Sequence, residues 1–236
     1  MSNIMLPQAS LFIGIIPALL LLYISLKGYE GHYKDKTIFL TFIIGVVLGF
    51  IAAFVQSYTV FAIIYMILLA FFDQFFKTII LNVGRLQEKR ETTIYGLSLG
   101  LGFGSSFTPF LIIAASSLME ISDVTILSLI AIGSFGIILF HGATTTYIGY
   151  GIYIGKLPKH VITAVILQIP FNALVGLTIA YARAEDILIQ LGFVVALILY
   201  GGIIFWYVNK NIMPQILSQQ MKRKRSAIKS KETKKE

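Results

Sequence analysis

Apolar segments of about 20 residues recur along the whole chain, and this recurrence limits its possible fold more than any other feature. A helix of about 20 residues spans the roughly 30 Å hydrocarbon core of a membrane. Seven such segments occur, at residues 5–26, 37–56, 58–82, 93–118, 124–154, 161–182 and 187–208. Only 13% of the 236 residues are charged, about half the share in a soluble domain. The sequence therefore predicts an all-α, polytopic membrane helical bundle with about seven transmembrane helices.

The lysines and arginines are divided unequally between the two sides of the predicted bundle. Seventeen of the 19 fall on one side, in residues 27–36, 83–92 and 155–160 and in the C-terminal tail. Arg183 is alone on the other side, and Lys77 lies inside a span. Cytoplasmic loops of membrane proteins are enriched in Lys and Arg. We therefore expect an outside N-terminus, a cytoplasmic C-terminus and a location in the cell (plasma) membrane.

The predicted domains are a transmembrane helical domain at 1–208 and a basic cytoplasmic tail at 209–236. From Lys210 onward the chain carries nine basic residues and two glutamates. Such a tail can contact anionic lipid headgroups, at about 1 kcal/mol per basic residue. A solvated stop-transfer tail and, more weakly, ribosomal RNA are the other interpretations. We expect membrane lipids as partners and no specific nucleic acid.

Polar residues inside the predicted spans form the candidate site. They are Asp73, Gln74 and Lys77 in the third span, Ser105 and Ser106 in the fourth, His141 and Thr145 in the fifth, and Gln168 and Asn172 in the sixth. Counting residues from the span ends brings Asp73, Ser105, His141 and Asn172 to similar depths near the bilayer midplane. Polar groups in a membrane are costly and often functional. We therefore expect a polar pocket between spans three to six.

Several roles are open for these residues. Asp73 and Lys77 are spaced i,i+4 with the acid first, an order that favours an ion pair on a helix. His141 is a candidate metal ligand, general base or hydrogen-bonded packing residue. A catalytic zinc usually has three protein ligands, and the chain has no cysteine, so we expect no metal and no cofactor. A Ser-His-Asp set drawn from Ser105 or Ser106 with His141 and Asp73 lacks the nucleophile-elbow context.

A stripe of glycines marks the fourth span. The residues Gly96, Gly100 and Gly104 form a GxxxGxxxG pattern, and small residues at this spacing let helix backbones approach closely. The contact could be within the fold or with a partner. Pro109 follows the stripe, and we expect it to kink the outer half of the helix.

The order of four motifs resembles the PrsW-like and CAAX-protease superfamily of glutamic intramembrane peptidases. The motifs are FFDQFFKT (71–78), YGLSLGLGFGSSFTP (95–109), LFHGATTTYIGYGI (139–152) and IPFNALVG (169–176). The family pattern has an EExxK helix, a YGxxxGxGFAxxEN helix, a histidine before a GYG, and a second histidine. The resemblance implies an intramembrane-peptidase-like fold in which carboxylates activate water and histidines position it.

The chain departs from this pattern at the catalytic positions. The paired glutamates fall on Asp73 and Gln74, the fourth-span glutamate on Phe107, and the second histidine on Asn172. The chain also resembles the multipass scaffold subunits of gamma-secretase, which have seven spans, an outside N-terminus, a GxxxGxxxG fourth span and a histidine in the fifth.

These resemblances imply a non-catalytic scaffold or substrate-binding protein with a membrane-protein partner or substrate. The alternative is an active intramembrane peptidase that uses Asp73 and His141, with Lys77 and Asn172 as further site residues. A channel or transporter subunit is the third interpretation.

Overall fold

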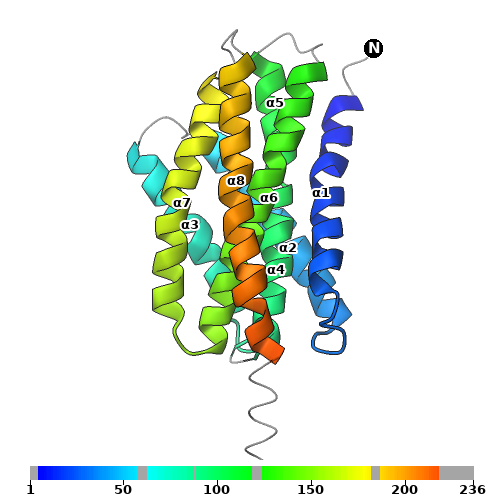
Figure 1. Cartoon of the computed structure of the whole chain (residues 1–236), viewed down its shortest axis with the longest axis vertical. Helices are drawn as coiled ribbons and strands as arrows, with labels where there is room; N and C mark the ends of the chain where they lie inside the picture. Colours follow the sequence, from blue (N-terminus) through cyan, green and yellow to red (C-terminus); the bar gives the residue numbers. More distant parts are fainter. Residues whose placement is uncertain (1–4, 58–62, 88, 119–123, 182–186, 218–236) are drawn as a thin grey trace, which may run out of the picture.

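The computed structural model describes residues 5–57, 63–87, 89–118, 124–181 and 187–217. In these residues the regular secondary structure consists of eight α-helices that lie side by side in one bundle (Figure 1). Their bounds are α1 (Met5–Leu26), α2 (Asp35–Ser57), α3 (Ile63–Leu81), α4 (Glu91–Ser105), α5 (Phe107–Leu118), α6 (Val124–Tyr153), α7 (Leu157–Ala180) and α8 (Ile187–Asn211). The prediction of an all-α bundle is thereby confirmed for the described residues.

Five helices contain a stretch that is long and apolar enough to cross a membrane, namely α2, α3, α6, α7 and α8. The apolar stretch described in α1 is shorter, at residues 11–26, and α4 and α5 are 15 and 12 residues long. Many large apolar side chains lie on the outside of the bundle, such as Phe72 on α3 and Ile203 on α8. An apolar exterior of this kind suits the hydrocarbon core of a membrane.

The predicted fourth segment, 93–118, is two helices that meet at Ser106. The break comes three residues before Pro109 and is explained by it. Proline has no N–H to donate to the carbonyl of residue i−4, and its ring clashes with that carbonyl, which here belongs to Ser105. The expected kink is thus a break between α4 and α5.

Helix α4 runs through the middle of the bundle, and every residue from Thr92 to Ser105 is buried. On one side a Cβ atom added at any of three glycines would overlap atoms of α6: Gly96, Gly100 and Gly104. On the other side Gly45 and Gly49 of α2 lie against the α4 backbone. The glycine stripe therefore faces α6 of the same chain.

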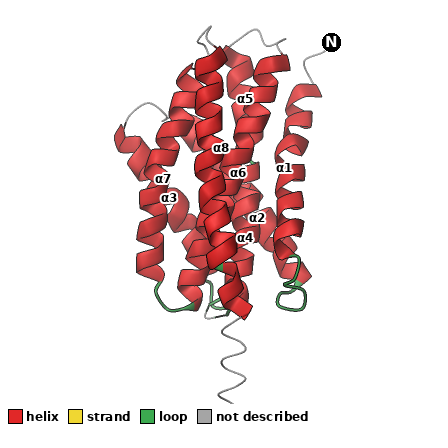
Figure 2. Ribbon diagram, viewed as in Figure 1, coloured by secondary structure: helices red, strands yellow, loops and turns green. Residues whose placement is uncertain are grey.

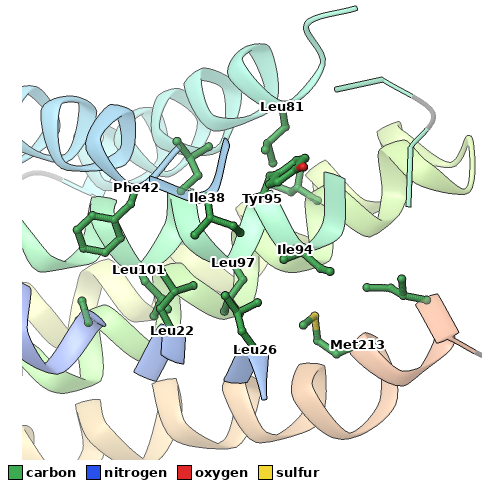
Figure 3. Packing of buried hydrophobic residues seen from close by; sticks show 14 of the residues in the cluster. Leu22, Leu26, Ile38, Phe42, Leu81, Ile94, Tyr95, Leu97, Leu101 and Met213 are labelled. Carbon is green, nitrogen blue, oxygen red and sulfur yellow. The ribbon is translucent and has the colours of Figure 1, made fainter. Parts of the chain in front are cut away.

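A cluster of buried apolar side chains fills the end of the bundle where α1 ends and α4 begins (Figure 3). Leu22 and Leu26 of α1 pack there with Ile94 and Leu97 of α4. Met213, just beyond α8, lies in the same cluster. The chain turns at Ile212 and continues as a short helical stretch to Leu217, so the segment that follows α8 closes the core at this end.

The connections between α1 and α2, between α3 and α4, and between α6 and α7 all lie at this same end of the bundle (Figure 2). These are the connections that carry the basic residues. Lys210 of α8 belongs to the same end, and its Nζ lies 4.6 Å from the centre of the Trp206 ring. Arg183 and the tail after Leu217 lie outside the described residues.

Candidate functional site

Five ionisable or amide side chains are buried together between α3, α6 and α7: Asp73, Gln74, Lys77, His141 and Gln168. Each is at most 5% exposed. A polar group buried in an apolar bundle is costly unless it is hydrogen-bonded. The partners of these side chains therefore decide what the site can do.

Gln168 of α7 links two neighbouring residues of α3. Its amide nitrogen donates a hydrogen bond of 2.6 Å to the Asp73 Oδ2, and its carbonyl oxygen accepts a hydrogen bond from the Gln74 amide nitrogen. The Gln74 Oε1 is buried and has no hydrogen-bond partner. We call this series Asp73–Gln168–Gln74 the amide chain.

Lys77 contacts His141 of α6 through a distance of 2.7 Å between Nζ and Nδ1. Its Nζ also lies 4.0 Å from the centre of the Phe103 ring, which is a cation–π geometry. Within the described residues the only ion pair closer than 4.0 Å joins Arg90 and Glu91. A direct Asp73–Lys77 pair, which the i,i+4 spacing favours, is therefore wrong.

Four phenylalanine rings surround His141. The ring centres of Phe103 and Phe107 lie 4.7 and 5.3 Å from that of His141, and those of Phe140 and Phe171 lie 5.4 and 5.8 Å away. Phe107, the position at which the family pattern has a glutamate, is stacked on the imidazole at 24°. The surroundings of His141 are thus its Lys77 contact and a mainly aromatic wall.

Sequence reasoning missed most of this wall. It singled out Phe107 only as a replaced glutamate, treated Phe103 only as part of a family motif, and did not consider Phe140 or Phe171. The i,i+4 spacing of Phe103 and Phe107, and the adjacency of Phe140 to His141, were the available signals. The contribution of Phe171 from α7 depends on helix packing and has no signal of this kind.

Asn172 lies one turn after Gln168 on α7, and it contacts α3 at a second level. Its side-chain nitrogen donates a hydrogen bond of 3.1 Å to the backbone carbonyl of Met66. Together with the amide chain and the Lys77–His141 contact, this bond gives α3 a series of polar attachments over the range from Met66 to Lys77. We call these attachments the polar seam of α3.

The remaining predicted site residues bond to backbone. The Ser105 hydroxyl donates to the Gly102 carbonyl at 2.7 Å, and the Ser106 hydroxyl donates to the Val46 carbonyl of α2 at 2.7 Å. The Thr145 hydroxyl donates to the His141 carbonyl at 2.7 Å. The structure therefore joins Asp73, Gln74 and Gln168 directly, and these three hydroxyls satisfy backbone carbonyls instead.

The arrangement places one carboxyl group and one imidazole in the same buried region, with an amide and an ammonium group as their respective partners. A general base must lie within hydrogen-bond reach of the proton that it abstracts. Across the part of the chain that the structure describes, no three side chains among His, Cys, Asp and Glu lie close enough to hold a metal ion.

No family model, curated protein or solved structure matches this chain. The fold and the buried polar residues define its class as an all-helical bundle with several helices of membrane-crossing length. The resemblance to the intramembrane peptidases stays a prediction.

Proposed function

We propose that the chain is a seven-span membrane protein related to the PrsW-like and CAAX-protease superfamily, and that it works as a non-catalytic scaffold or substrate-binding protein in the cell membrane. The observation that carries this proposal is that the two groups that could activate water each already contact another side chain. The Asp73 carboxylate accepts a hydrogen bond from Gln168, and the His141 Nδ1 contacts Lys77.

The position of Phe107 supports the non-catalytic interpretation. Where the family pattern has a carboxylate, this chain has an aromatic ring stacked on His141. A phenyl ring can neither accept a proton nor orient water by a hydrogen bond, so it replaces a catalytic group by an apolar one. It also fills space beside the imidazole that a water molecule would need.

The convergence of the motif positions supports the proposed relationship. Residues 73, 74 and 77 of α3, residue 107 of α5 and residue 141 of α6 come from three motifs of the family pattern. Lys77 and Phe107 both contact His141, and residues 73 and 74 lie one turn before Lys77 on α3 and bond to Gln168. A resemblance by chance would not require these separate segments to converge.

The seven spans and their orientation are part of the proposal. Helices α4 and α5 together have about the length of one span, and the other six helices supply one each. The connections with basic residues share one end of the bundle, which the positive-inside rule assigns to the cytoplasm. Trp206, 59% exposed beneath Lys210, suits a membrane–water interface, where tryptophan is enriched.

The partners follow from this arrangement. Lipids cover the apolar exterior, a second membrane protein is the partner or the bound substrate, and the basic tail contacts anionic headgroups. Extraction of the full chain from its native membrane in a mild detergent should yield a complex with a stoichiometric membrane protein. Recovery of the chain alone, at the size of a monomer, would contradict the scaffold role.

A cleavage assay tests the absence of catalysis. The full chain is reconstituted in liposomes with a library of transmembrane peptides, beside the matched variants Asp73→Asn and His141→Ala. We expect the wild type to cleave no more than either variant. Cleavage by the wild type that both substitutions abolish would instead establish an active intramembrane peptidase.

A further inference from the structure

We propose that Asp73 is a proton-binding site, and that the charge of its carboxyl group sets the direction of the amide chain between α3 and α7. This inference concerns a property beyond the proposed scaffold role, and it holds whether or not the chain has a partner. The ligand is a single proton, and the groups that respond to it are the side-chain amides of Gln168 and Gln74.

The observed direction of the amide chain is the one that an ionised Asp73 requires. A carboxylate only accepts hydrogen bonds, so Gln168 turns its NH₂ group toward the Asp73 Oδ2. The Gln168 carbonyl then points to Gln74, which must present its own NH₂ group. The Gln74 Oε1 is the end of the series, and it is buried without a partner.

A proton carried on the Asp73 Oδ2, the oxygen that Gln168 contacts, reverses each of these bonds. A protonated carboxyl group has one O–H donor, and the Gln168 amide, whose nitrogen lies 2.6 Å from Oδ2, supplies an acceptor once it turns its carbonyl oxygen toward Asp73. Gln168 then turns its NH₂ group toward Gln74, whose Oε1 accepts the bond. The terminal torsions of glutamine are broad and roughly two-fold, so each amide can turn over without moving its backbone.

The two states keep α3 and α7 joined but differ in what Gln74 presents. Both contain one Asp73–Gln168 bond and one Gln168–Gln74 bond. In the ionised state the free group of Gln74 is a carbonyl oxygen, and in the protonated state it is an NH₂ group. A change in the charge of Asp73 is thus passed through Gln168 of α7 to Gln74 of α3, whose free group changes from an acceptor to a donor.

The charged groups around Asp73 determine which state is populated. Lys77 follows one turn later on α3, and His141 faces Lys77 from α6. The ionisable residues of α2, α4 and α7 are Asp35, Lys36, Glu91, Tyr95, Lys159 and His160, all near the first turns of their helices. Lys77 is therefore the nearby cation that favours an ionised Asp73, although the two are not in direct contact.

Removal of Lys77 should move Asp73 to its protonated state. A buried carboxylate without a nearby cation is strongly disfavoured relative to its neutral form. The variant Lys77→Met keeps an unbranched apolar stem but removes the charge. Lys156→Met, in the connection between α6 and α7, is the matched control because it removes a lysine far along the chain from Asp73.

Infrared spectroscopy of the full chain in lipid, with isotope-labelled aspartate, reads the charge directly. The chain has four aspartates, and subtraction of the Asp73→Asn spectrum isolates one of them. At neutral pH we expect a protonated carboxyl band from Asp73 in Lys77→Met, and none in the wild type or in Lys156→Met. In the wild type the band should appear reversibly on acidification. A band that is already present in the neutral wild type, or absent from Lys77→Met, would overturn the proposal.

Solid-state NMR of side-chain ¹⁵N-labelled glutamine tests the reversal itself, with Gln168→Leu used to assign the signal. In the wild type the Gln168 nitrogen signal should shift in step with the Asp73 carboxyl band. A Gln168 signal that stays constant while Asp73 changes charge would refute the coupling. The wild-type titration needs no substitution at Lys77, so the test stands even if Lys77→Met fails to fold.

Discussion

Replacement of Gly100 by alanine tests how closely α4 and α6 are packed. An added Cβ would lie 2.8 Å from both the Cβ and the Oγ1 of Thr145 and would overlap the carbonyl oxygen of His141. The carbonyl belongs to the α6 backbone, so it can give way only if the two helices separate. Overpacking of this kind costs about 1–3 kcal/mol, and van der Waals packing is a main source of helix association in membranes.

Alanine also favours the helix itself, and this gain must be subtracted. Gly→Ala in a helix interior is worth about 1 kcal/mol, which leaves Gly100→Ala about 0–2 kcal/mol less stable than the wild type once the overpacking cost is included. Gly192→Ala in α8 is the matched control, because nothing lies within 4 Å of its added Cβ. That variant should gain about 1 kcal/mol from the same propensity.

The assay is reversible unfolding in mixed detergent micelles, followed by circular dichroism. The two alanine variants share the helix-propensity gain, so their free energies of unfolding should differ by the overpacking cost alone, about 1–3 kcal/mol. Equal stability of Gly100→Ala and Gly192→Ala would refute the close backbone contact. Gly100→Leu should lose the folded bundle altogether, because a larger side chain enters the same space.

Three further outcomes are expected. A reporter fused to the C-terminus should read as cytoplasmic and a glycosylation tag within 119–123 as external, and the opposite pattern would reverse the proposed orientation. Lys77→Met should lower the free energy of unfolding by about 1–3 kcal/mol, the cost of removing one partner of a buried polar contact, because His141 loses its Lys77 contact and Asp73 loses its nearby cation. Adding Asp73→Asn should restore part of this loss, because an amide has no charge that the lysine would favour; no recovery in the double variant would mean that the charge balance between residues 73 and 77 is unimportant. The Gly28 N–H donates to the Glu30 carboxylate and lowers the pKa of that group. The contribution of this hydrogen bond to stability is therefore present at neutral pH, and it is lost as the pH falls through the lowered pKa of Glu30. Glu30→Gln should remove this acid-dependent loss, which is measured by melting temperature against pH.

The helices could be predicted from the sequence because hydropathy is a local property. The first segment, 5–26, coincides with α1, and the segment 124–154 matches α6 to within one residue. A kink caused by Pro109 was predicted, but the division of 93–118 into two helices at Ser106 was not, since the hydropathy continues across it. Only the i−4 carbonyl that Pro109 obstructs fixes its place.

The candidate site was predictable as a set of residues but not as a set of contacts. The i,i+4 rule relates side chains along the surface of one helix, and it favoured a pair between Asp73 and Lys77. Both side chains instead point away from α3 toward other helices, where Gln168 and His141 are the partners. The choice of partner depends on how neighbouring helices pack against α3, and a single sequence does not specify that packing.

The burial of α4 has a consequence for how the chain enters a membrane. At 15 residues this helix is about 22 Å long, at 1.5 Å per residue, and so falls short of the roughly 30 Å hydrocarbon core. It is also rich in glycine and hydroxyl side chains, which gain little from lipid. In the proposed seven-span topology the long apolar helices could insert independently, whereas α4 would need α5 to complete a crossing and would pack its glycine faces against α2 and α6. We therefore expect α4, at the centre of the bundle, to take its place last, once α2 and α6 are there to pack against it.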